Sequence, residues 1–114
     1  MSVKLSSRQV GDVNVVDVAG RITLGEGSSA LRDALRDMVG KSQKKILLNL
    51  ADVSYIDSSG IGELVSGFTT VTNSGGQLKL LNLTKRVKDL LQITKLYTVF
   101  DVHDDEAAAV RSFS

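Results

Sequence analysis

The segment Ile46-Leu47-Leu48-Asn49-Leu50 constrains the fold of this chain more than any other feature, because it is a short and almost unbroken apolar run. A strand with one face in water alternates apolar and polar residues, whereas a strand covered on both faces does not. Strands of the second kind occur mainly in parallel sheets, where helices cover them. The run therefore predicts a buried central strand in an α/β protein.

The sequence before this run predicts a hairpin and a helix. Val3 and Leu5 alternate with polar residues, and the valines at 13, 15, 16 and 18 form a second strand after a tight turn at Gly11-Asp12. The segment 19–29 is rich in Gly and Ser and is expected to be a loop. It leads to a helix for which Gly40 is the expected C-cap. The apolar face of that helix comprises Leu31, Ala34, Leu35, Met38 and Val39.

Strands and helices alternate after the run. Residues 51–57 are expected to be a loop, and the helix that follows has apolar residues at helical spacing from Ile61 to Val71. The next elements are a strand over 78–83, a short helix capped by Thr84, a strand over 97–102, and a terminal helix capped by Asp104 or Asp105. The order β-β-α-β-α-β-α-β-α predicts one domain, residues 1–114, with a mixed, mostly parallel sheet, an N-terminal hairpin and about four α-helices.

The charge balance and the lack of cysteine limit the classes of site and partner. Lys plus Arg number 14 and Asp plus Glu 13, so the net charge of +1 gives no electrostatic reason to expect nucleic acid or an anionic membrane as a partner. Without cysteine, the chain has no disulfide, thiolate metal site or cysteine nucleophile. The N-terminus lacks the apolar core of a signal peptide, and no stretch reaches the roughly 18 uncharged residues of a membrane span. We therefore expect a soluble cytoplasmic protein that is monomeric before it binds a partner.

The segment 55–62, Tyr-Ile-Asp-Ser-Ser-Gly-Ile-Gly, is the most informative for function. It follows a buried strand and opens a helix, and in open α/β sheets ligands gather at the carboxyl ends of the strands. Asp and Ser are also ordinary helix N-caps, so the motif alone is compatible with a structural role. Gly60 and Gly62 weaken that interpretation, because each costs roughly 0.5–1 kcal/mol relative to alanine in a helix. They suggest that something approaches the backbone closely, and they leave Ile61 open as a partner contact or a core residue.

Phosphorylation of Ser58 would give this segment a switch. A phosphate brings about −1.5 to −2 charges, and the start of a helix favours anions, so the fold tolerates it. A partner docked over the same helix end would instead meet added bulk and charge beside Asp57. The residue types alone do not distinguish Ser58 from Ser59 as the acceptor.

Enzymatic and metal-binding interpretations have less support. The segment is not a Gly-x-Ser-x-Gly elbow, and the chain has no phosphate-binding loop. A hydrolase that uses Ser58 or Ser59 would need His103, the one histidine, to lie close in space. The acidic residues 104–106 are expected to cap a helix rather than to bind a cation. Lys85, Arg86 and Lys88 are expected to form a solvated helix face rather than a nucleic-acid site, because the chain offers few aromatic residues for base stacking.

On these residues the chain resembles the STAS-domain anti-sigma factor antagonists of bacteria. The resemblance extends from Val3 to Val110 and is strongest over 46–62, which contain the buried strand and the Asp-Ser-Ser-Gly-hydrophobic-Gly motif. The segments 75–78 and 87–96 support it. The resemblance implies the STAS fold.

The resemblance also implies a mechanism. Ser58 is the residue phosphorylated, by a partner anti-sigma factor with serine kinase activity, and the unphosphorylated antagonist binds that partner and frees a sigma factor. A serine phosphatase restores the active form. ATP and metal belong to these partners, so no cofactor or metal is expected in this chain. Asp57 positions the serine and the partner, and the predicted contacts at the start of the helix are Ser59, Gly60, Ile61 and Gly62.

One position departs from the family's pattern. Many members carry an acidic residue in the turn after the second strand, where this chain has Thr23 in Gly20-Arg21-Ile22-Thr23. Thr23 is a predicted partner contact, and Glu26 is a candidate source of the missing charge. The departure keeps an alternative open, in which the chain is a STAS scaffold or accessory module in another signalling or transport complex and is not phosphorylated.

Overall fold

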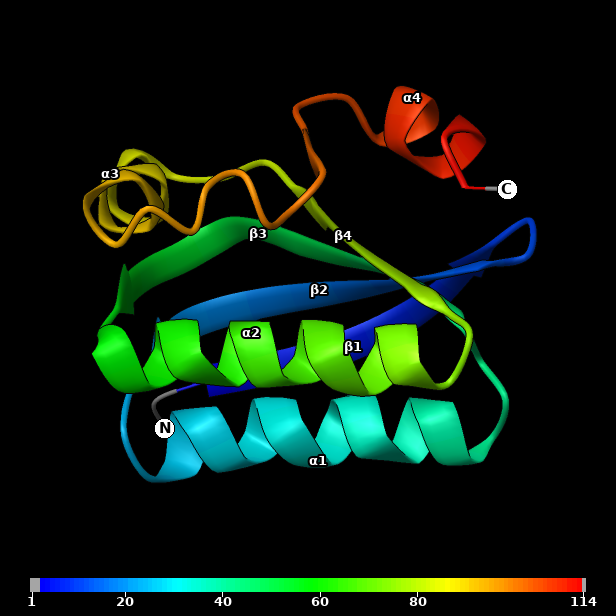
Figure 1. Ribbon diagram of the computed structural model, residues 1–114, viewed down its shortest axis with the longest axis horizontal. Coiled ribbons are helices and arrows are strands. Elements are labelled where there is room, and N and C mark those ends of the chain that lie inside the picture. Colours follow the sequence, from blue (N-terminus) through cyan, green and yellow to red (C-terminus); the bar gives the residue numbers. More distant parts are fainter. Residues whose placement is uncertain (1–2, 114) are drawn as a thin grey trace.

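The apolar run 46–50 lies in the central strand of a five-stranded sheet, in a computed structural model that describes residues 3–113 (Figure 1). The sheet order is β1-β2-β3-β4-β5, with β1 and β2 antiparallel and the remaining neighbours parallel. The strands are β1 (Val3–Val10), β2 (Val13–Ile22), β3 (Lys45–Ile56), β4 (Gln77–Leu81) and β5 (Val102–His103). The mostly parallel sheet with an N-terminal hairpin is confirmed, and all four apolar residues of the run are fully buried.

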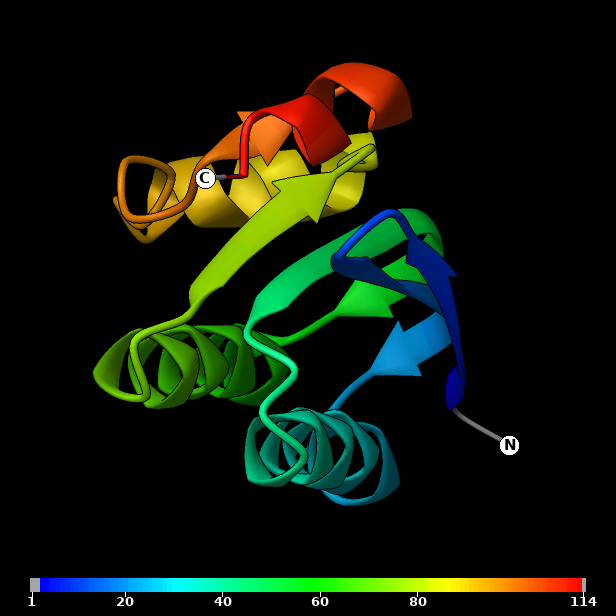
Figure 2. The same ribbon diagram turned by 90° about the vertical axis from the view of Figure 1, so that its right-hand side faces the viewer.

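Four helices cover the sheet within the described residues: α1 (Glu26–Gly40), α2 (Ser58–Asn73), α3 (Lys85–Ile93) and α4 (Glu106–Arg111). Helices α1 and α2 lie side by side on one face, and α4 lies on the other (Figures 1 and 2). Gly67 of α2 allows the close approach, because a Cβ there would lie 2.3 Å from the Leu35 Cδ1 atom of α1. The expected helix count and element order are confirmed.

Two apolar clusters fill the space between these layers. The larger one lies between the sheet and the pair α1 and α2, and it includes Val87 and Leu91 of α3. The smaller one lies on the opposite face, under α4. Its buried members are Val13, Val15, Leu47, Leu81, Ala109 and Phe113. Leu47 therefore faces away from its neighbours Ile46 and Leu48, which belong to the larger cluster, as the period of a strand requires.

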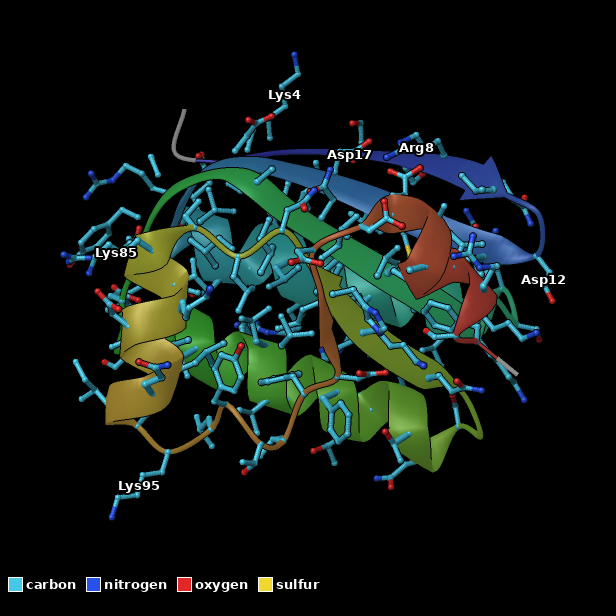
Figure 3. All side chains as sticks on the ribbon, turned by 90° about the horizontal axis from the view of Figure 1, so that it is seen from above. Lys4, Arg8, Asp12, Asp17, Lys85 and Lys95 are labelled. Carbon is cyan, nitrogen blue, oxygen red and sulfur yellow. The ribbon has the colours of Figure 1, made fainter. Side chains whose placement is uncertain are left out.

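Helix α4 is attached to the hairpin by charge as well as by packing. Arg8 of β1 lies beside Asp17 and the start of α4 (Figure 3), with its Nε atom 2.7 Å from Asp17 and an Nη atom 2.6 Å from Glu106. Hydrogen bonds from Arg8 lower the pKa of both carboxyl groups. Asp105, one of the two expected caps, accepts a hydrogen bond from the Ala108 N–H at 2.9 Å.

Strand β3 continues beyond its pairing with β4, which ends at Asn49. Helix α3 packs against β3, and its residues Val87 and Leu91 are fully buried. The predicted Thr84 cap is present, since its Oγ1 atom accepts a hydrogen bond from the Val87 N–H at 3.4 Å. The end of β3 therefore lies between α3 and the first turn of α2.

Several predicted boundaries are wrong. Strand β2 reaches Ile22 and β3 reaches Ile56, so residues 19–22 and 51–56 of the expected loops are strand, paired through two register shifts. Their Gly, Ser and Asp residues gave no strand pattern, and long-range pairing overrides that local preference. The first expected loop is limited to residues 23–25, because α1 begins at Glu26. Gly40 is the last residue of α1 rather than its cap, and Ser42 takes the positive φ of 61°. The expected strand over 97–102 is mainly a turn, with β5 limited to Val102 and His103.

Candidate functional site

Asp57 joins two segments at the carboxyl ends of β2 and β3. It is the N-cap of α2, and its Oδ1 atom accepts a hydrogen bond from the Gly60 N–H at 2.9 Å. Its Oδ2 atom accepts one from the Leu24 N–H at 3.2 Å, and its own N–H donates to the Ile22 carbonyl at 3.4 Å. A single carboxylate thus fixes the start of α2 against the turn that follows β2.

That turn contains Thr23. Its carbonyl accepts hydrogen bonds from the N–H and the hydroxyl of Ser28 at 3.0 and 2.9 Å, and Gly25 has a φ of 97° that favours glycine. Gly27 has no room for a side chain, because a Cβ would lie 2.6 Å from the Arg21 carbonyl oxygen. The turn is therefore tightly built, and it brings the Thr23 segment next to Asp57.

The two candidate serines differ in exposure. Ser58 is the first residue of α2 and is exposed, whereas Ser59 is only partly exposed. Ser58 also lines a groove, which Ser59 does not. The structure thus supplies a distinction between the two hydroxyls that the sequence could not.

The two glycines of the motif have different surroundings. A Cβ on Gly60 would lie 2.2 Å from the Ile22 carbonyl oxygen and 2.6 Å from Ile56 Cγ1, so the close approach is made by the chain itself. A Cβ on Gly62 would have nothing within 4 Å, and Gly62 is exposed. Ile61 is 3% exposed and belongs to the larger apolar cluster, which supports its interpretation as a core residue, and its predicted contact with a partner stays a prediction.

A groove of about 440 Å³ separates the start of α2 from α3. Tyr55, Asp57 and Ser58 line one side, and four residues of α3, namely Arg86, Asp89, Leu90 and Ile93, line the other. Ile93 is 76% exposed. The sequence patterns did not predict this groove, because α2 and β4 lie between its two sides in the amino-acid sequence.

The most exposed large apolar side chain among residues 3–113 also belongs to this region. Leu24 is 79% exposed, and its backbone is bonded to Asp57. Two different segments therefore bring exposed apolar residues to the region of Ser58: the backbone of Leu24 is bonded to the neighbouring Asp57, and Ile93 lines the groove with Ser58. The sequence contains a signal that each of these side chains is exposed. Leu24 precedes a glycine in a turn, and Ile93 lies off the apolar face of α3 that Val87 and Leu91 define.

Two arginines stack on Tyr55 beside the groove. The guanidinium carbon of Arg21 lies 4.7 Å from the ring centroid, and that of Arg86 lies 4.3 Å from it. The neighbouring Lys85, at the start of α3 (Figure 3), pairs instead with Asp89 at 2.7 Å. The expected solvated basic face of α3 thus contains one residue, Arg86, with a defined place over an aromatic ring.

His103 does not line the Ser58 groove. Its Nε2 atom lies 3.2 Å from Asp101 Oδ2 and 3.4 Å from Ser112 Oγ, at β5 and the end of α4. One ring nitrogen makes both contacts, whereas a catalytic serine and its orienting carboxylate need one nitrogen each. His103 instead lines a separate groove of about 450 Å³ with Lys88 and Tyr97.

The acidic residues 104–106 have structural roles at two positions, as the cap Asp105 and the Arg8 partner Glu106. Among residues 3–113, no group of three or more His, Asp and Glu side chains is arranged to ligate a metal ion. In the same part of the chain, no helix combines the length and the apolar composition that crossing a membrane requires.

Comparison with known proteins gives consistent matches over almost the whole chain. A sequence model of the STAS domain family matches residues 4–109. The chain is 33% identical to the anti-sigma-B factor antagonist of Bacillus subtilis over 102 residues. This matched region covers 90% of this chain and 92% of that protein.

Solved structures show the same fold. An anti-sigma factor antagonist from Mycobacterium paratuberculosis superposes with a TM-score of 0.84 at 18% identity, over 98% of this chain and 94% of that one. The phosphorylated form of the Bacillus cell fate determinant SpoIIAA superposes with a TM-score of 0.74 at 18% identity, over 95% and 97% of the two chains.

Proposed function

The chain belongs to the STAS domain family, with relatives named anti-sigma factor antagonists, and we propose that it binds an anti-sigma factor and is inactivated by phosphorylation of Ser58. The observation that carries the proposal is the exposure of Ser58 at the first residue of α2, beside the exposed apolar side chains of Leu24 and Ile93. A hydroxyl that a kinase can reach therefore adjoins a surface that a partner can cover.

The fold tolerates a phosphate at this position. The first residues of a helix have unpaired N–H groups and a partial positive charge, which favour an anion. SpoIIAA, which shares the fold, occurs in a phosphorylated form, and this supports the same conclusion. Phosphorylation of Ser58 is thus expected to leave the free energy of unfolding almost unchanged.

A bound partner does not tolerate the same phosphate. The added group carries about −1.5 to −2 charges and lies next to the Asp57 carboxylate. A partner that covers Leu24 and Ile93 has to remove both charges from water, which is costly unless each is paired. Binding is therefore lost while the fold is kept, and this combination gives a reversible switch.

The chemistry of the switch resides in the partners. We assign the kinase activity to the anti-sigma factor and the reverse reaction to a serine phosphatase, so that ATP and metal bind to those proteins. In this chain, Asp57 and the Thr23 turn position the segment around Ser58. No catalytic residue is assigned to it.

Phosphosite mass spectrometry after incubation with ATP and the candidate anti-sigma factor tests the proposal. We expect a phosphate on Ser58, none on the Ser58→Ala variant, and normal phosphorylation of Ser66→Ala, which removes an exposed serine from the same helix. Ser58→Asp should bind the partner at least about tenfold more weakly than Ser58→Ala, a difference of about 1.4 kcal/mol.

Intact binding without phosphorylation would refute the switch. That result would favour the scaffold alternative, and Thr23→Asp would then be the variant to test for restored phosphorylation. Binding of Ser58→Asp as tight as that of the wild type would also contradict the proposal.

A further inference from the structure

The two arginines on Tyr55 have unused hydrogen-bond donors. Stacking on a ring engages the flat face of a guanidinium group and leaves its in-plane N–H groups available. Among the described residues, none forms a hydrogen bond or an ion pair with the side chain of Arg21 or of Arg86. The N–H groups of a guanidinium match carboxylate and phosphate oxygens, so an anion is the partner that they fit.

Arg86 is the member of this pair that lines the same groove as Ser58. The two carboxylates of the groove are already engaged. Asp89 pairs with Lys85 at 2.7 Å, and Asp57 accepts hydrogen bonds from two backbone N–H groups. The groove therefore contains a guanidinium group without an anionic partner and a serine hydroxyl to which a phosphate can be attached.

We propose that Arg86 binds the phosphate group on Ser58, and that it leaves Tyr55 to do so while Arg21 remains stacked there. The inference rests on the proposed function only in taking Ser58 as the phosphorylated residue. It assigns Arg86 a role in regulation that neither the motif nor the helix start supplies. The move costs Arg86 one contact with the partly exposed ring of Tyr55, and the charge-assisted hydrogen bonds to the phosphate replace it.

This assignment explains how a phosphate on α2 also affects the surface of α3. A phosphate held by Arg86 connects the start of α2 to α3 across the groove. Leu90 and Ile93 form the apolar part of the α3 side, so the connection obstructs access to them. The second arginine also gains a function, because Arg21 keeps Tyr55 covered when Arg86 moves.

The test uses the whole chain with phosphoserine incorporated at position 58 during synthesis, so that no kinase or partner is needed. The second pKa of the phosphate is measured by ³¹P NMR titration. A nearby guanidinium favours the dianion, so this pKa should rise by about half a unit in Arg86→Gln relative to the parent. Arg111→Gln removes the same charge from α4, which lies far from the start of α2 (Figure 1), and should leave the pKa unchanged.

An equal phosphate pKa in the parent and Arg86→Gln proteins overturns the inference. Weaker binding of unphosphorylated Arg86→Gln to the anti-sigma factor, together with an unchanged phosphate pKa, overturns it as well and assigns Arg86 to partner docking. Because phosphoserine is installed directly, failure of the kinase reaction refutes the proposed function without affecting this result. Circular dichroism of each variant checks that it is folded.

Discussion

Replacing Gly60 by alanine should strongly destabilise the protein, whereas the same replacement at Gly62, two residues further along α2, should stabilise it. The new Cβ at position 60 would lie 2.2 Å from the Ile22 carbonyl oxygen and 2.6 Å from Ile56 Cγ1. The carbonyl belongs to the backbone of β2 and accepts the Asp57 N–H, so it cannot rotate away as a side chain could. At position 62 the new Cβ would meet nothing within 4 Å.

These distances determine the expected change in the free energy of unfolding for each variant. Relief of the clash at position 60 requires β2 and α2 to separate by about 1 Å, and overpacking of this kind typically costs about 1–3 kcal/mol. The change at Gly62 adds no contact and removes the conformational cost of glycine, a gain of about 0.5–1 kcal/mol. Because 1 kcal/mol corresponds to a shift of about 4 °C in a domain of this size, the two melting temperatures should differ by roughly 10 °C.

Urea unfolding followed by circular dichroism measures both effects. We expect a lower midpoint for Gly60→Ala, a higher one for Gly62→Ala and the same slope for both, since neither change alters the surface exposed on unfolding. Equal stability of the two variants would refute the packing argument at Gly60. The more stable Gly62→Ala protein should nevertheless bind the anti-sigma factor more weakly, because the added methyl group occupies the open space beside Gly62 that a partner would approach.

Three further predictions concern neighbouring features. Asp57→Ala should lower the free energy of unfolding by about 1–2 kcal/mol, measured in urea, because it removes an N-cap. The pKa values of Asp17 and Glu106 are lowered by Arg8, so their contribution to stability is present above the ordinary values of 3.8 and 4.5 and is lost as the pH falls below them. Arg8→Met should therefore show a smaller loss of melting temperature between pH 6 and pH 3 than the parent, and an equal loss would contradict the assignment. Ile93→Ser should leave the urea midpoint nearly unchanged, since the residue is exposed, and should weaken binding of the anti-sigma factor in a titration.

The features that the sequence predicted correctly depend on short-range patterns. The run 46–50 indicated a doubly covered strand, and the helical spacing from Ile61 to Val71 indicated α2. Thr84 was recognised as a cap because an N-cap is bonded to an N–H only three residues away. These features are determined by the residues themselves and their near neighbours in the chain.

The site itself depends on contacts between segments that are distant in the sequence. The ends of β2 and β3 looked like loops because their strand character comes from pairing with each other, and not from an alternating pattern. Gly60 has to be glycine because of Ile22, on a different strand. The same holds for Ile61, whose burial could not be read from the motif.

The sequence by itself therefore determined the order of the elements, the character of the central strand and the identity of the motif around Ser58. Only the tertiary structure placed Leu24 against Asp57 and Arg86 in the groove beside Ser58. The physical reason is that periodicity and capping act within a few residues, whereas the surroundings of a side chain depend on which segments pack against it.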